Sequence, residues 1–264
     1  VERTISLLEE AHALCPDMEQ LVFELAYVLN HTGAEPNATA EKIGSMVPSL
    51  VTVRDDIAIE WATAYNRAHR YDEAIRILEG HDFVPCEGGE TALAKAYIAA
   101  WYGKGMDLRA AGKDAEALDA FRRAEVLPES LGAGLWHMAT IVPAQYEEAL
   151  LLEKAGDRDA AFKIYDYFNT LYVDFFSNMN LPLLPVYQAL GDIRMGKADA
   201  AKALLEKAIA GWKFERERHD SGYFGTTPFF ISYMDDPHTA RVKNYDALIA
   251  TAEAVLDGTS ELLK

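Results

Sequence analysis

Two short strings of this chain hold the residue types that could carry chemistry. The first is DFVPCEGGETA at 82–92, in which Glu87 and Glu90 flank Gly88 and Gly89. Two neighbouring carboxylates can serve as an acid and a base or can bind a cation, and paired glycines let a ligand or another backbone approach closely. The competing interpretation is a linker in which Glu90 stabilises the start of the next helix through the helix dipole. The position of Glu90 at that start favours the linker.

The second string is HDSGYFGTTPFFISYMDDPH at 219–238, where histidine, aspartate and aromatic residues gather. His219, Tyr223 and Phe224 are candidates for binding, because exposed aromatic rings suit contacts with sugars or peptides. A metal site would need the histidines and aspartates to converge, but their spacing is not that of a known ligand set, so no metal is expected. The alternative is an aromatic plug, in which Phe224 and a further phenylalanine insert into the core beside the last helix.

The remaining sequence shows no motif of a known reaction. It has no nucleophile elbow, no phosphate-binding loop, no dinucleotide-binding glycine motif and no zinc-protease motif. We therefore expect a protein that is not an enzyme and that needs no cofactor. Cys15 and Cys86 lie far apart and form no metal-binding or redox motif, which predicts two reduced thiols.

A repeated spacing predicts the elements that must position these strings. Four stretches pair a small residue with an alanine twelve residues later, across a tight turn: Ala62 with Ala74, Gly105 with Ala117, Ala149 with Ala161, and Ala189 with Ala201. Small residues let two antiparallel helices approach closely. Three of the turns carry a glycine that suits the left-handed position after a helix, namely Gly112, Gly156 and Gly196. The pattern predicts four helical hairpins.

The expected architecture is all-α, a right-handed solenoid of antiparallel helical hairpins that forms one continuous domain over residues 1–256. The turn of the first hairpin has His69 in place of glycine, so we expect that turn to be less favourable. The lone first helix has no partner before it, which suggests a piece of a longer protein. The predicted elements are a helix at 2–14, hairpins at about 54–80, 91–127, 138–177 and 183–217, an aromatic loop at 220–236, a closing helix at 238–256 and a tail at 257–264.

The hairpins resemble the tetratricopeptide repeat, whose pattern runs W-x2-L-G-x2-Y and then A-x3-F. Trp101, Gly105, Ala117 and Phe121 follow that pattern best. Gly105 is therefore expected to pack against Ala117 and Phe121. Successive alanines lie 40–44 residues apart, whereas the usual repeat has about 34 residues, so the helices or the links must be longer.

The net charge of −17 argues against binding of nucleic acid and of anionic membranes, because both need clustered Lys and Arg. It is compatible with basic peptides or neutral sugars, although solubility alone would explain it. No apolar run reaches the ~18 residues of a membrane helix, and no signal peptide is evident, so we expect a cytoplasmic protein.

Four strings together resemble a bacterial family of large proteins of unknown function. They are RDDIAIEWATAYNRAHRYDEAIRILEGHDFVPCEGGE, VLPESLGAGL, VYQALGDIRMGKADAAKALLEKA and GYFGTTPFFISYMDDP. In that family a β-rich region similar to galactose-mutarotase-like sandwiches precedes tetratricopeptide-like repeats. Its counterpart of the first candidate string is similar to R-x-F-x-P-W-E-G-G-E-G. Here Cys86 replaces the tryptophan, which removes an aromatic surface on which a sugar could stack.

Two functions remain open at this point. The first is a non-catalytic helical-repeat scaffold that binds a protein, a peptide or another domain of its parent chain. The second is an accessory part of a carbohydrate-active enzyme, with Glu87, Glu90 or the 219–238 string completing a site in an upstream domain. Convergence of the two strings with inward-facing carboxylates would favour the second function. A bare groove lined by helix residues would favour the first.

Overall fold

The computed structural model describes residues 1–50, 53–84, 90–132, 138–172, 181–218 and 237–263. Within these ranges the chain is all-helical and contains no β-strand, which confirms the expected all-α class. The chain divides into two compact units, residues 1–136 and 137–264. The predicted aromatic loop at 220–236 lies outside the described residues.

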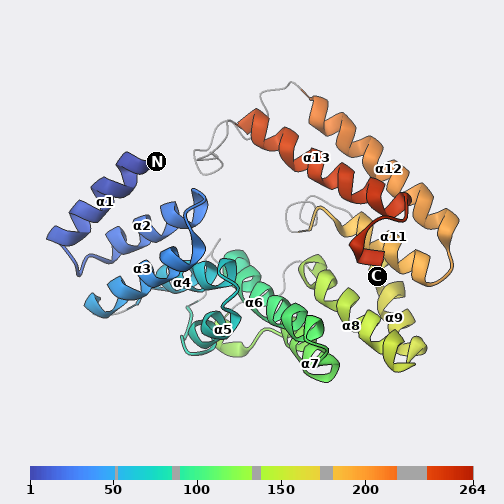
Figure 1. Cartoon of the computed structure of the whole chain (residues 1–264), viewed down its shortest axis with the longest axis horizontal. Helices are drawn as coiled ribbons and strands as arrows, with labels where there is room; N and C mark the ends of the chain where they lie inside the picture. The colour runs from blue at the N-terminus through green and yellow to red at the C-terminus, as the bar shows by residue number, and fades with distance from the viewer. Residues whose placement is uncertain (51–52, 85–89, 133–137, 173–180, 219–236, 264) are drawn as a thin grey trace. The chain divides into compact units, whose positions relative to one another are not determined.

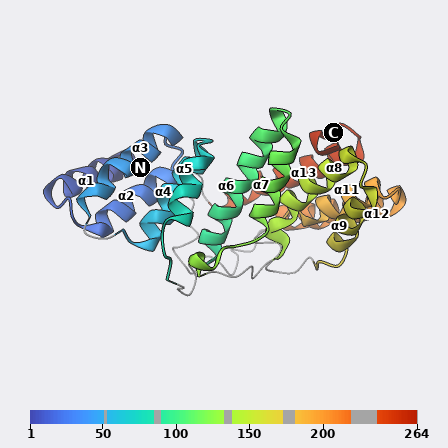
Figure 2. The same ribbon diagram turned by 90° about the horizontal axis from the view of Figure 1, so that it is seen from below.

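The first unit is a series of helices in which neighbours along the chain pack side by side (Figure 1, Figure 2). In addition, α2 packs on α4 and α4 packs on α6. Contacts between every second helix are those that stacked hairpins require. The helices are α1 (Glu2–Leu14), α2 (Glu19–His31), α3 (Pro36–Met46), α4 (Asp55–Arg67), α5 (Tyr71–Glu79), α6 (Glu90–Ala110) and α7 (Asp114–Ala124), with 3-10 turns at Val47–Ser49 and Glu129–Leu131.

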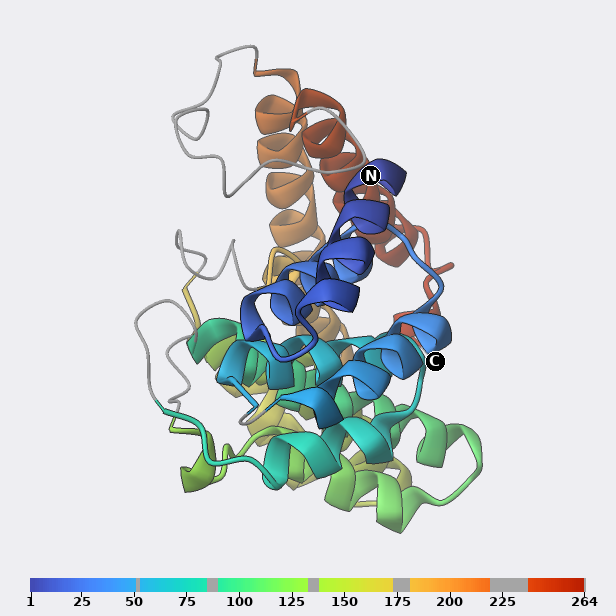
Figure 3. The ribbon, with the colours of Figure 1, turned by 90° about the vertical axis from the view of Figure 1, so that its left-hand side faces the viewer.

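The second unit contains α8 (Val142–Ala155), α9 (Arg158–Phe168), α11 (Leu184–Arg194), α12 (Ala198–Glu217) and α13 (Pro237–Leu256), with 3-10 turns at Met138–Ile141 and Glu261–Leu263. Helix α11 packs on α8, α9, α12 and α13. The long helices α12 and α13 lie side by side (orange and red in Figure 3). The core of this unit is built around the fully buried rings of Tyr146, Tyr165 and Phe168.

The hairpin turns show why glycine recurs in them. Gly112, Gly156 and Gly196 have φ angles of 74°, 91° and 78°, which confirms the predicted left-handed conformation. His69 occupies the matching turn between α4 and α5 with a φ of 56°. That conformation costs a residue with a Cβ about 1–2 kcal/mol. The Nδ1 atom of His69 lies 3.1 Å from the hydroxyl of Tyr71, a contact that glycine could not make.

The close approach of α6 and α7 depends on Gly105. A Cβ atom added to Gly105 would lie only 2.5 Å from Cε1 of Phe121, which is fully buried. The predicted contact between Gly105 and Phe121 is therefore confirmed. Gly103, two residues earlier on α6, leaves equally little room for a Cβ beside the ring of Tyr71, a contact that the repeat pattern does not predict.

Candidate functional site

Most of the residues predicted to bind a ligand cannot be placed. Glu87, Gly88, Gly89, His219, Tyr223 and Phe224 lie outside the described residues, and so does Cys86. Glu90 is the first residue of α6. The acid–base pair, the aromatic surface and the aromatic plug therefore all stay predictions. The second cysteine, Cys15, is an exposed free thiol at the end of α1.

The residues that lead into the first candidate string are held in place by Asp55 at the start of α4. One carboxylate oxygen of Asp55 lies 2.7 Å from Nε2 of His81, and the other accepts a hydrogen bond of 2.9 Å from the backbone N–H of Val84. Phe83 is buried with its ring centroid 4.5 Å from that of His81, and its backbone N–H donates to the carbonyl of Ser130. These contacts anchor residues 81–84, where the string starts, to the first unit.

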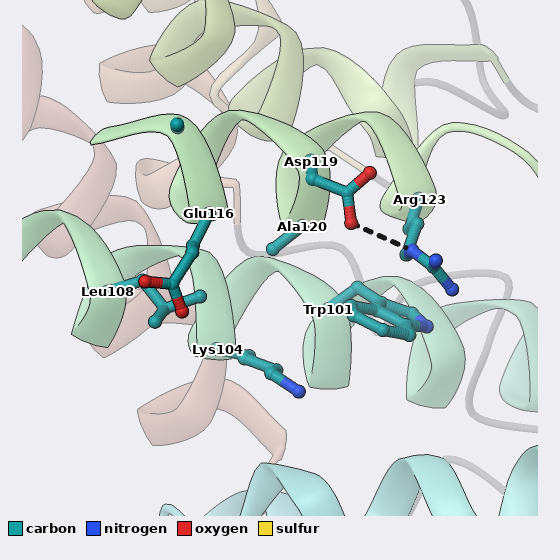
Figure 4. Close-up of a pocket in the computed structure, with 8 residues that line it drawn as sticks. Trp101, Lys104, Leu108, Glu116, Asp119, Ala120 and Arg123 are labelled. Atoms are coloured by element: carbon teal, nitrogen blue, oxygen red, sulfur yellow. Dashed lines mark hydrogen bonds and ion pairs between the residues drawn. The ribbon is translucent and has the colours of Figure 1, made fainter. Parts of the chain in front are cut away.

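The surface of the first unit has a hollow of about 500 Å³ on the hairpin of α6 and α7 (Figure 4). Spacings of three and four residues place the lining side chains on one face of each helix. Helix α6 contributes Trp101, Lys104 and Leu108, and α7 contributes Ala115, Glu116, Asp119, Ala120 and Arg123. We call this the α6–α7 hollow.

Two cations lie close to the buried ring of Trp101 in the α6–α7 hollow. The Nζ atom of Lys104 lies 5.1 Å from the centroid of the Trp101 ring, and Cζ of Arg123 lies 4.9 Å from it. Such cation–π contacts contribute about 0.5–1 kcal/mol each at exposed sites. Figure 4 shows Arg123 reaching toward the tryptophan from α7, while Lys104 extends from α6, the helix that also carries Trp101.

Each of these cations also has a carboxylate partner. Lys104 forms an ion pair of 2.6 Å with Asp72 of α5, and Arg123 forms one of 3.0 Å with Asp119 of α7. The α6–α7 hollow is therefore of mixed charge and is not a basic patch. Its lining, as described above, contains no Ser, Cys or His, the usual nucleophiles and bases of active sites. The groups it exposes are mainly paired charges and the methyl group of Ala115, while the Trp101 ring is buried beneath them.

A second polar cluster connects α2 with α4 inside the first unit. The Asn30 amide donates to the carboxylate of Glu60 at 2.7 Å, and Arg67 donates to the Asn30 carbonyl oxygen at 3.1 Å and to the carbonyl of Ala34 at 3.0 Å. Burial raises the pKa of Glu60, and the hydrogen bond from Asn30 opposes that rise. These hydrogen bonds join α2 and the residues just after it to α4.

A third polar cluster, in the second unit, binds residues near the end of the chain. Tyr146 of α8 and Arg194 of α11 donate hydrogen bonds to the backbone carbonyls of Leu262 and Leu263. The sequence pattern predicts only a tail at residues 257–264 and does not reveal this contact. No local signal could reveal it, because the bonded residues are 116 and 69 positions apart.

Among the residues that line the α6–α7 hollow, the sequence patterns singled out only Trp101. Trp101 matches the tetratricopeptide pattern, but that pattern does not predict its contact with two cations. In the sequence, Lys104 and Arg123 look like ordinary charges on helix surfaces. Their meeting at one ring depends on how closely α6 and α7 pack, which spacing within either helix does not specify.

In the part of the chain that the structure describes, no three His, Cys, Asp or Glu side chains gather closely enough to hold a metal ion. None of the described helices combines the length and the hydropathy needed to cross a membrane. Comparisons with protein-family models, with characterised proteins and with solved structures gave no match to this chain.

Proposed function

We propose that this protein is a non-catalytic helical-repeat scaffold that binds another polypeptide through the α6–α7 hollow. The observation that carries the proposal is a surface hollow where Lys104 and Arg123 remain partly exposed above the Trp101 ring, which is itself only 6% exposed. Tryptophan and arginine are among the residues most enriched where protein interfaces gain their binding energy. A polypeptide can offer both an apolar side chain for the floor and charges of either sign for the rim.

The proposed architecture is a stack of tetratricopeptide-like hairpins within each unit. Two observations support it: the twelve-residue spacing that recurs four times in the sequence, and the contacts that α2 makes with α4 and α4 with α6. Repeat proteins of this kind present extended surfaces rather than deep catalytic clefts. A scaffold that contacts a partner along its helices is the function that such a surface serves best.

A selection experiment tests the proposal and does not require the partner to be identified first. A library of random peptides is selected for binding to the parent protein, and the enriched peptides are titrated against two variants. Ala115→Arg places a long side chain into the α6–α7 hollow from an exposed position on α7. The matched control is Ala110→Arg, which adds the same side chain at an exposed position of α6 that does not line the hollow.

We expect the selected peptides to share a sequence motif and to bind Ala115→Arg at least about tenfold more weakly than the parent, a loss of about 1.4 kcal/mol. Their affinity for Ala110→Arg should be unchanged. Selection without a shared motif, or binding that is indifferent to Ala115→Arg, would show that the α6–α7 hollow is not the contact surface.

A further inference from the structure

Residues 260–263 fold back onto the second unit instead of extending into solvent. Helix α13 ends at Leu256, and Gly258 follows with a φ of 71°, the left-handed conformation that reverses the chain. The 3-10 turn Glu261–Leu263 comes next, closed by a hydrogen bond from the N–H of Leu263 to the carbonyl of Ser260. Figure 1 shows the end of the chain beside α11.

Two side chains of the second unit bind consecutive backbone carbonyls of this turn. The hydroxyl of Tyr146 donates to the carbonyl of Leu262 at 2.7 Å, and Nη2 of Arg194 donates to the carbonyl of Leu263, also at 2.7 Å. A side chain that binds backbone carbonyls recognises the shape of a turn and not its particular residues. We call Tyr146, Arg194 and the groups that support them the carbonyl cradle.

The carbonyl cradle is supported by a partly buried acid and a second tyrosine. Glu153 lies 3.6 Å from Nη1 of Arg194 and accepts a hydrogen bond of 3.1 Å from the hydroxyl of Tyr165. Burial raises the pKa of Tyr165, and the charge of Glu153 raises it further, so the hydroxyl keeps its proton and remains a donor. Arg194 is thus held in the orientation that binds a carbonyl.

Apolar contacts add selectivity to the carbonyl cradle. Leu262 and Leu263 pack against the core of the second unit but remain only partly buried. Glu261, the residue before them, is exposed. The turn is therefore held by the two hydrogen bonds of the cradle, by hydrogen bonds from the backbone N–H groups of Thr259 and Ser260 to the carbonyl of Ala254, and by two leucines. Gly258 joins it to α13, and neither leucine leaves a fully buried position when the turn is released.

We propose that the carbonyl cradle is a peptide-binding site that the chain fills with its own residues 260–263. When that turn leaves, the site accepts a Leu-Leu segment of another polypeptide, with its two carbonyls bound by Tyr146 and Arg194. The turn seated in the cradle shows the chemistry of the ligand directly. This site uses no residue of the α6–α7 hollow, so its test and that of the proposed function succeed or fail independently.

The chain's own turn competes with any external ligand, because a tethered segment acts at an effective concentration that reaches millimolar. The apparent affinity of an added peptide therefore falls with the fraction of molecules whose cradle is empty. Replacing both leucines in the 264-residue chain, as Leu262→Ser with Leu263→Ser, should empty the cradle without altering its walls. We call this protein the released variant.

The probe is a fluorescein-labelled peptide of the sequence DGTSELLK, residues 257–264, with an amide at its C-terminus. We expect it to bind the released variant at least about tenfold more tightly than the parent, because the competing turn is gone. A peptide with both leucines changed to serine should bind neither protein. Adding Arg194→Met to the released variant should weaken binding of the probe about tenfold or more, as loss of a charged hydrogen bond predicts.

The matched control is Arg158→Met in the released variant. Arg158 lies on α9 over the ring of Phe162, and neither of the two hydrogen bonds that hold the turn involves it, so binding should be unchanged. Circular dichroism tests whether the released variant keeps its helices. If the double variant loses them, the single variant Leu263→Ser takes its place, with the same expected results. Absence of binding to the folded variant, equal binding to the parent, or indifference to Arg194→Met would each overturn the proposal.

Discussion

The α6–α7 hollow and the carbonyl cradle use similar side chains in opposite ways. Each combines an aromatic residue with an arginine that has a carboxylate partner: Trp101 with Arg123, and Tyr146 with Arg194. The side chain of Arg123 is 54% exposed, whereas that of Arg194 is only 25% exposed. Water can accept hydrogen bonds from the Arg123 guanidinium, whereas the less exposed Arg194 needs acceptors within the protein. The chain supplies these acceptors itself, with the carbonyl of Leu263.

This difference shows how exposure decides what a polar group requires. A solvent-facing arginine leaves its surface open to an incoming partner, because water is easily displaced. A partly buried arginine costs stability unless its hydrogen bonds are made. Under the two proposals, the α6–α7 hollow is a surface open to a partner and the carbonyl cradle is a site that the chain already fills. The predictions below test that distinction, from the largest expected effect to the smallest.

Removing the two arginines should have unequal effects on stability. Arg194→Met takes a charged donor away from the Leu263 carbonyl and from Glu153, so we expect the free energy of unfolding to fall by about 1.5–3 kcal/mol. Arg123→Met removes an exposed ion pair and a cation–π contact, for a loss of about 0.5–1 kcal/mol. Urea denaturation of both variants measures the two values. Equal losses would show that the interactions of Arg194 contribute no more to the free energy of unfolding than those of Arg123.

The rigidity of the hairpin beneath the α6–α7 hollow depends on a glycine and can be tested with a matched pair. Gly105→Leu should lower the free energy of unfolding by about 1–3 kcal/mol, because its side chain collides with Phe121. Gly211→Leu on α12 meets nothing within 4 Å, so its better helix propensity should stabilise the protein by about 0.5–1 kcal/mol. Thermal unfolding followed by circular dichroism reports both signs. A harmless Gly105→Leu would contradict the close packing of α6 on α7.

The polar cluster of Glu60 should give the smallest effect, visible only as a change with pH. Because burial raises the folded-state pKa of Glu60 above its ordinary 4.5, its protonated form favours folding. That contribution is fully present below pH 4.5 and is lost as the pH rises through the folded-state pKa. Glu60→Gln should therefore flatten the decline of stability with pH above 4.5. Glu116→Gln, at an exposed position of α7, is the control. A parent-like slope in Glu60→Gln would show that this carboxyl does not titrate differently on folding.

Local sequence patterns were sufficient for the helical class and for several details of the turns. Small residues twelve positions apart recur four times across predicted tight turns, so the all-α class followed without information on long-range contacts. Gly112, Gly156 and Gly196 were expected to be left-handed, and they are, because a Cβ is disfavoured in that conformation wherever it occurs. The Gly105–Phe121 contact was also expected, since it joins two helices separated by one short turn.

The candidate sites were much less accessible to sequence reasoning. The residues predicted to bind, from Glu87 to Phe224, were chosen for their chemical types, and all but Glu90 lie outside the described residues. The α6–α7 hollow was missed because Lys104 and Arg123 look like ordinary surface charges until both helices are in place. The same holds for Gly103, whose role depends on Tyr71 of another helix.

By itself, the sequence determined where helices form and how their turns are made, because both depend on residues within a few positions of one another. Only the tertiary structure decided which polar groups face water and which must be satisfied inside. The Tyr146 hydroxyl illustrates the division: its bond to Leu262 spans 116 positions and forms only when α13 and the turn after it return to α8 and α11. Burial and long-range hydrogen bonding are properties of packed surfaces, and no local pattern encodes which surfaces will meet.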